Sequence, residues 1–156
     1  MCWQCDNPDA TTETYLARLR TMVTQHRWAI QYVEGDRPFG YTIGLHPKGL
    51  PELLITGMPP NTSARLLNSI AHQMADDGVT LRPGTHIDYQ DEFFLEVVEV
   101  DQPDVHLVFA AGLFGAGIRA VQLVWTDDRC RWPWDRGWSN PRRRQPVLGV
   151  RSPAPR

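Results

Sequence analysis

Apolar residues recur along the chain with two different periods, one typical of helices and one typical of strands. Between Asp9 or Thr11 and His26 they recur every three to four residues, which predicts an amphipathic helix with a polar cap at its start. The same spacing predicts a second helix over residues 61–77, before Gly78. The expected inward face of this second helix consists of Leu66, Leu67, Ile70, Ala71 and Met74.

Short runs rich in β-branched and aromatic residues predict strands. The expected strands cover residues 28–33, 39–46, 51–57, 86–89, 93–100 and 119–126. A turn at residues 47–49 joins the second and third strands into a central hairpin. Alternation places Ile43 and Leu45 on one face of the sheet, where we expect Leu67 and Ile70 of the second helix to pack.

The order of these elements predicts the fold class. Strands outnumber helices and most connections are short, so we expect one α+β domain, with a twisted, largely antiparallel sheet and two main helices packed against it. Residues 104–111 fit a short helix or a strand. The domain is expected to cover residues 1–149, followed by a mobile C-terminal tail over residues 150–156.

Composition and charge indicate the number of domains, the expected location and the distribution of charge along the chain. A chain of 156 residues with 42% hydrophobic and 22% charged residues is typical of one globular domain. No apolar run is long enough for a membrane span, so we expect a cytoplasmic protein with no membrane partner. Residues 1–128 hold 17 acidic and 8 basic residues, a net charge of −9, whereas residues 129–156 hold 1 acidic and 8 basic residues, a net charge of +7.

The three cysteines suggest a metal site, a redox pair or plain reduced thiols. Cys2 and Cys5 have C-x-x-C spacing, which lets two thiolates bind one zinc ion from a tight turn. Cys130 is the candidate third ligand, and a histidine would be the fourth. Zinc is therefore the one cofactor that the sequence suggests, while a dithiol redox role and unligated thiols remain as alternatives.

Polar side chains in the central hairpin are the candidates for chemistry. His46 and Glu52 are the two side chains there suited to general acid–base catalysis near neutral pH. The residues expected to line a ligand pocket beside them are Tyr41, Thr42, Gln122 and Trp125. A structural interpretation competes with this one, because Glu52 can also close a turn by accepting backbone N–H groups. Whether the protein is an enzyme is left open.

Tryptophan and arginine alternate near the C-terminus. Trp132, Trp134 and Trp138 lie among several arginines, a composition found in single-strand nucleic-acid binding. The alternative is a structural anchor, in which the aromatic rings pack an irregular segment onto the sheet. We favour the anchor, because the charge of −9 on residues 1–128 repels nucleic acid. The expected partner is a protein or a small molecule.

Three motifs support a family resemblance. YTIGLH at 41–46, PELLITG at 51–57 and QLVWTDD at 122–128, with Pro133-Trp134 beyond, resemble an uncharacterised bacterial family that is frequent in actinobacteria. The resemblance runs from Met1 to Gly149 and implies no activity. We therefore expect a binding or accessory module. The alternatives are a small-molecule enzyme or ligand-binding protein with a pocket near the 41–52 hairpin, and a zinc-stabilised domain.

Overall fold

A computed structural model of the chain describes residues 6–138 and 145–153. Within these residues, two long helices are accompanied by two short ones. The helices are α2 (Thr12–His26), α3 (Pro60–Asp76), α4 (Pro103–His106) and α5 (Val108–Phe114). The strands are β1 (Ala29–Val33), β2 (Phe39–Ile43), β3 (Glu52–Thr56), β4 (His86–Tyr89), β5 (Phe93–Glu99) and β6 (Ala120–Trp125), with a 3-10 turn, η1 (His46–Lys48), between β2 and β3. None of these helices is both long and apolar enough to cross a membrane.

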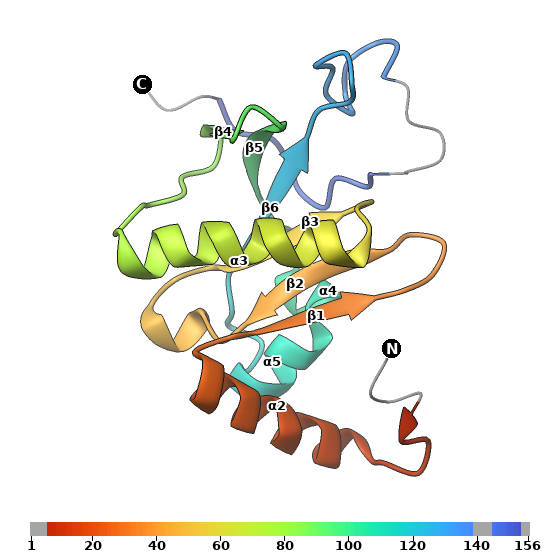
Figure 1. The fold of residues 1–156 in the computed structure, drawn as a ribbon, viewed down its shortest axis with the longest axis vertical. Helices are drawn as coiled ribbons and strands as arrows, with labels where there is room; N and C mark the ends of the chain where they lie inside the picture. The colour runs from red at the N-terminus through yellow and green to blue at the C-terminus, as the bar shows by residue number, and fades with distance from the viewer. Residues whose placement is uncertain (1–5, 139–144, 154–156) are drawn as a thin grey trace.

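The strands form one mixed sheet in the order β1-β2-β3-β6-β5-β4 (Figure 1). All neighbouring strands are antiparallel except β3 and β6, which run parallel with Glu52 opposite Ala120. The predicted α+β class and largely antiparallel sheet are confirmed. Residues 104–111, for which the sequence allowed either a helix or a strand, belong to α4 and α5 apart from Leu107 between them.

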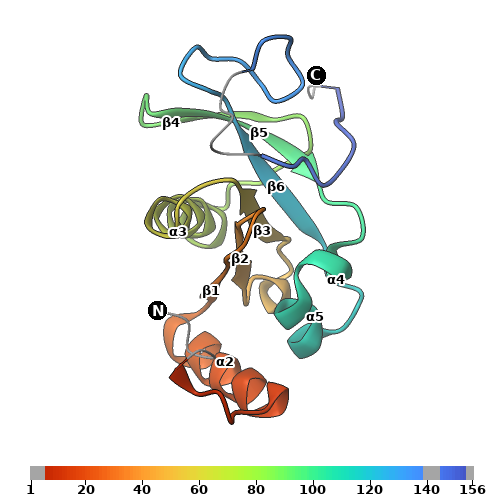
Figure 2. The ribbon, with the colours of Figure 1, turned by 90° about the vertical axis from the view of Figure 1, so that its right-hand side faces the viewer.

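The two faces of the sheet have different covers. Figure 2 shows α3 on one side of the strands and α4 and α5 on the other. The cluster on the α3 side includes Leu45, Leu53, Leu67, Ile70 and Trp125. The cluster on the opposite side, packed by α2 and α5, includes Tyr15, Leu19, Ile43, Leu54 and Ala110. Strands β3 and β6 lie between the two clusters, and every residue in them is buried.

The expected shared face of Ile43 and Leu45 is wrong. Leu45 packs with Leu67 on the α3 side, whereas Ile43 belongs to the opposite cluster. Strand β2 ends at Ile43, and Gly44 follows with φ +127°, so the alternation stops there. A side chain at Gly44 would also come within 2.9 Å of the Arg27 carbonyl oxygen. The backbone therefore turns at a position that only glycine tolerates.

Residues 145–153, here called the C-terminal strap, follow the sheet face opposite α3 across β3, β6 and β5 (Figure 2). The Asp101 N–H donates to the Leu148 carbonyl oxygen at 2.8 Å. Gly149 lies so close to β5 that a Cβ there would fall 1.9 Å from the Glu99 carbonyl oxygen. The strap thus covers the part of this face that no described helix covers, and it includes the first residues of the predicted tail.

Candidate functional site

The carboxylate of Glu52, the first residue of β3, links the two strands of the central hairpin. Its Oε1 accepts three backbone N–H groups, from residues 44–46, at 2.7–2.9 Å. Its Oε2 accepts the Thr42 hydroxyl at 2.7 Å, and Thr42 Oγ1 accepts the Leu53 N–H at 2.9 Å. We call this arrangement the hairpin latch. It ties the end of β2, the start of η1 and the start of β3 together.

The latch gives Glu52 a structural environment. The residue is fully buried, and no cation of the described residues forms an ion pair with it. Burial raises the pKa of the Glu52 carboxyl, while hydrogen bonds from the His46 N–H and the Thr42 hydroxyl oppose that rise. Both oxygens are occupied by donors, so the geometry favours the structural interpretation of Glu52 over proton transfer.

His46 meets Glu52 through its backbone. The His46 N–H donates to Oε1, whereas the half-buried imidazole packs 5.8 Å from the Phe114 ring, measured between centroids. An imidazole–carboxylate hydrogen bond between His46 and Glu52 does not occur among the hydrogen bonds of the described residues. The structure therefore brings the two catalytic candidates together without the contact that acid–base catalysis needs. Their catalytic role stays a prediction.

Tyr41, expected in a ligand pocket, lies in the core instead of on a surface. It is 1% exposed, and its hydroxyl oxygen accepts the Phe109 N–H of α5 at 3.2 Å. Burial raises the pKa of the Tyr41 phenol. The ring also stacks with Phe39 at a centroid distance of 6.0 Å. These contacts hold α5 against β2.

Gln122, at the centre of β6, binds the C-terminal strap. Its Nε2 donates to the Pro146 carbonyl oxygen at 2.8 Å and to Thr56 Oγ1 at 3.2 Å. Its Oε1 accepts the Leu148 N–H at 2.8 Å. The Thr56 hydroxyl donates to the same Pro146 carbonyl oxygen at 2.8 Å. Every hydrogen-bonding group of this predicted ligand-binding side chain thus contacts the chain itself, mainly the strap.

Trp125, at the end of β6, is held in the same way. Its indole N–H donates to the Thr56 carbonyl oxygen at 2.8 Å. The side-chain amide of Gln145 bonds both backbone groups of Trp125, at 2.8 Å to the N–H and 2.9 Å to the carbonyl oxygen. Trp138 packs beside it, with ring centroids 6.2 Å apart. The four predicted pocket residues are therefore buried and internally bonded, and their role in binding a separate ligand stays a prediction.

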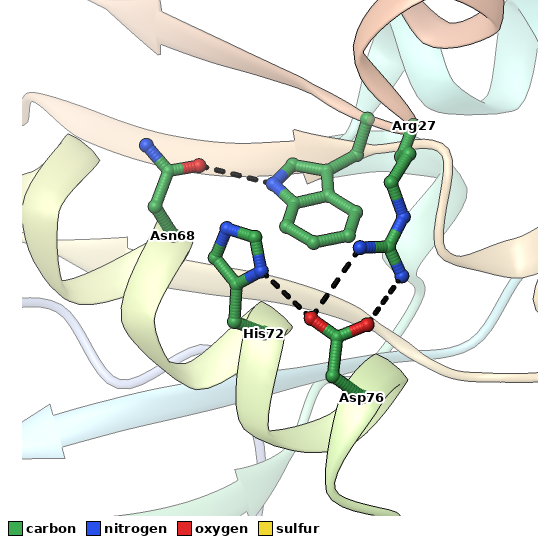
Figure 3. Close-up of polar contacts among 5 residues, drawn as sticks. Arg27, Asn68, His72 and Asp76 are labelled. Carbon is green, nitrogen blue, oxygen red and sulfur yellow. Dashed lines mark hydrogen bonds and ion pairs between the residues drawn. The ribbon is translucent and has the colours of Figure 1, made fainter.

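A second polar cluster lies at the surface, between the end of α2 and α3 (Figure 3). Arg27 donates two hydrogen bonds to Asp76, at 2.7 and 3.3 Å, and His72 Nδ1 bonds the same carboxylate at 3.0 Å. The Trp28 indole N–H donates to Asn68 Oδ1 at 3.0 Å. Hydrogen bonds from Arg27 and His72 lower the pKa of Asp76 to about 2. This exposed cluster fixes the α2–β1 junction on α3, and its geometry suits a structural role.

An aromatic and cationic cluster occupies the other end of the sheet, beyond β6. Trp132 and Trp134 stack with centroids 5.4 Å apart and an interplanar angle of 12°. The Arg151 guanidinium carbon lies 3.8 Å from the centroid of Trp134, and the His86 ring lies 5.2 Å from Trp132. We call these four residues the aromatic stack. All four side chains are partly or largely accessible.

A buried carboxylate joins His86 and Arg151, the two members of the stack that are not tryptophans. The Glu96 side chain is 2% exposed, and its Oε1 lies 2.7 Å from His86 Nε2. Arg151 donates from Nε to Oε2 at 2.7 Å and from Nη2 to Oε1 at 2.9 Å. Burial raises the pKa of Glu96, but the hydrogen bonds from Arg151 and His86 outweigh burial, so the pKa lies below its ordinary value. Glu96 is thus the centre of the cluster.

Reasoning from the sequence found Trp132 and Trp134 but missed their partners. His86 and Glu96 face each other in the β4–β5 pair, and this register follows from the short hairpin between the two strands. That signal was available. Arg151 is 55 residues from Glu96, and no pattern in the sequence indicates the contact.

The proposed zinc ligands are not brought together by the described residues. Cys2 and Cys5 lie outside those residues. Cys130 is exposed, follows β6 in a loop and has φ +59°. In residues 6–138 and 145–153, no three His, Cys, Asp or Glu side chains are arranged to hold a metal ion. Zinc binding at Cys2, Cys5 and Cys130 stays a hypothesis.

Comparison with known proteins gives a family and no activity. A family model described as Domain of unknown function (DUF4262) matches residues 22–139. No curated protein and no solved structure matches the chain. The matched region contains all six strands, the hairpin latch and both stacked tryptophans, while the C-terminal strap follows it. Because this match covers most of the chain, the protein belongs to the DUF4262 family of domains of unknown function.

Proposed function

We propose that the protein is a binding module whose recognition surface lies at the aromatic stack. The observation that supports this is the accessibility of the stack: two partly exposed indoles lie beside a half-exposed arginine and histidine, with side-chain exposures of 45% and 52%. Tryptophan and arginine are the side chains most enriched at the energetic centres of protein interfaces. The expected partner is a protein, and the expected location is the cytoplasm.

The hairpin supports a binding module over an enzyme. Glu52, the strongest acid–base candidate, is fully buried, and both of its carboxylate oxygens accept hydrogen bonds that hold β2, η1 and β3. A general base must reach the proton of its substrate directly or through one water. The small-molecule pocket near the 41–52 hairpin and the zinc-stabilised domain are alternatives with less support.

Partner capture with matched variants tests the proposal. Native mass spectrometry of the purified protein, and mass spectrometry of its copurifying proteins, are compared for wild type, Trp134→Ala and His46→Ala. The binding module predicts a partner that is lost with Trp134→Ala and retained with His46→Ala. A small molecule lost with His46→Ala and retained with Trp134→Ala would instead favour the hairpin pocket and reject the proposed surface.

A further inference from the structure

We propose that the sheet face under the C-terminal strap is a peptide-binding groove that selects arginine, and that the strap is its ligand in cis. This inference rests on the proposed binding function and names the class of its partner, whose arginine takes the place that Arg151 holds in the aromatic stack. The groove is formed by β3, β6 and β5 together with Trp134. Its ligand is an extended peptide segment that carries an arginine.

The arginine contact has the features of a specific guanidinium site. A buried carboxylate receives two parallel N–H groups from Arg151, at 2.7 and 2.9 Å, which is the bidentate geometry that lysine cannot reproduce. The Trp134 ring lies 3.8 Å from the guanidinium carbon and adds a cation–π contact. His86 Nε2 bonds Oε1 of the same carboxylate, the oxygen that Arg151 Nη2 also contacts, and helps to fix its orientation. Glu96 and Trp134 thus contact the guanidinium directly, and His86 contacts it only through the carboxylate.

The backbone groups of the strap bond to residues other than those that contact Arg151. Gln122 bonds the carbonyl group of Pro146 and the N–H of Leu148. The backbone N–H of Asp101 bonds the Leu148 carbonyl oxygen. Contacts to backbone groups give affinity without regard to sequence, as in the recognition of extended peptides by sheets. Arginine and the partly buried Leu148, which packs against the apolar cluster of α2 and α5, supply the selectivity.

The family match covers the residues of the groove and does not cover the strap that occupies it. Residues 22–139 contain every groove residue named here, whereas the strap begins at Gln145. The matched part of this chain therefore includes Glu96 and Gln122, whereas the segment that bonds them here lies outside the match. A face built with donors, acceptors and a buried charge suits an extended peptide. The preferred sequence presents an apolar residue three positions before an arginine, as Leu148 and Arg151 do.

Attachment in cis makes the strap a competitor of any external peptide. A short covalent link gives an effective concentration of roughly millimolar, which an external peptide at micromolar concentration does not overcome. A partner therefore binds when the hold of the strap is weakened, or when the partner itself binds more tightly. The strap acts as an autoinhibitory segment on the groove.

A peptide added in trans tests this inference on the full-length chain. The probe is a fluorescein-labelled peptide of residues 145–153, with Arg151→Lys and Arg151→Ala peptides as controls. Fluorescence anisotropy measures binding to wild type, to Leu148→Ala/Arg151→Ala, and to Val150→Ala, a strap variant at a position 83% exposed. We expect the double variant to bind the probe at least ~10-fold more tightly than wild type or Val150→Ala. The lysine peptide should bind ~10-fold more weakly, because it loses the bidentate contact.

Glu96→Gln in the double variant should abolish the preference for arginine over lysine. A folded double variant that does not bind the probe, or binds the lysine peptide equally well, overturns the inference. If the double variant does not fold, hydrogen exchange on the wild-type chain replaces it. Unlabelled peptide added well above the ~millimolar effective concentration of the strap should speed exchange of the Leu148 N–H, and unchanged exchange overturns the inference. If the peptide fails while Trp134→Ala still loses a copurifying partner, the ligand class is wrong and the binding module stands. If both fail, both proposals are rejected.

Discussion

The hydroxyl of Thr42 donates to Oε2 of Glu52 at 2.7 Å, and this contact joins the motif YTIGLH to the motif PELLITG. Thr42 also accepts the Leu53 N–H at 2.9 Å, so one hydroxyl serves both strands. The glycine at 44 allows the backbone turn that aims three N–H groups at the carboxylate. The two motifs are therefore two halves of one structural element, the hairpin latch.

Removing the hydroxyl from the latch should destabilise the fold. Thr42→Val leaves the Leu53 N–H and one lone pair of Glu52 without their partner in a buried site, which costs roughly 1–3 kcal/mol in the free energy of unfolding. Urea denaturation followed by circular dichroism measures this loss. Thr24→Val is the matched control, because Thr24 lies on the exposed side of α2, and its cost should stay within ~0.5 kcal/mol. An undisturbed stability in Thr42→Val, with loss of a bound molecule, would favour the hairpin ligand pocket.

The two clusters on opposite faces of the sheet predict a pattern of coupling. Leu67→Ala and Ile43→Ala should each lower the free energy of unfolding by roughly 2–5 kcal/mol, because both side chains are fully buried. Leu45→Ala with Leu67→Ala should be non-additive, since both belong to the α3-side cluster. Ile43→Ala with Leu67→Ala should be additive within about 0.5 kcal/mol. Strong coupling in the second pair would place Ile43 back on the face of Leu67. Denaturant titrations of the single and double variants measure both couplings.

Acid should weaken the anchor of the strap. The pKa of Glu96 in the folded state lies below its value in the unfolded state, which is ~4.3. The stability from its contacts with Arg151 and His86 is therefore fully present above pH ~4.3. This stability is lost as pH falls through the lowered pKa. Near-UV circular dichroism and tryptophan fluorescence, recorded with denaturant between pH 7 and pH 3, should show the loss. The stability of Glu96→Gln should fall less over the same acidic range, because this variant has no carboxyl to protonate. An equally steep fall in this variant would assign the loss of stability to another group.

The cysteine hypothesis predicts stoichiometric zinc. Protein purified without chelator should contain about one zinc ion per chain, and Cys2→Ser or Cys5→Ser should each remove it, because structural zinc requires four ligands. Elemental analysis of the wild type and both variants measures the content. Cys130→Ser separates a three-cysteine site from one that uses only the C-x-x-C pair. Sub-stoichiometric metal in the wild type would indicate reduced thiols without a site.

Secondary-structure elements, whose patterns depend on residues close together in the sequence, were predictable. The apolar face of α3 follows helical periodicity, and Leu66, Leu67, Ile70 and Met74 are all buried as expected. Along β6, Val121, Leu123 and Trp125 pack on the α3 side, while Gln122 points to the other face. Such patterns arise because the side-chain direction repeats every 3.6 residues in a helix and every two residues in a strand.

Contacts that depend on the three-dimensional arrangement of the chain were not predictable. The sequence marked Glu52 and Gln122 as polar residues in apolar strands, but their partners depend on how the backbone turns at Gly44 and on where the strap lies. In both cases the tertiary structure supplied the donors and acceptors that a buried polar group requires. For that reason, the polar residues that the sequence marked as a candidate site form structural hydrogen-bond networks instead.

The contact between Glu96 and Arg151 shows this most clearly. The amino-acid sequence by itself determined that β5 is a strand and that the C-terminal region is basic and aromatic. Only the fold decided that an arginine 55 residues further along would reach one carboxylate of that strand. The reason is physical: a carboxylate becomes stable at a buried position when the folded chain brings a cation with matching geometry to it, and sequence periodicity carries no information about that approach.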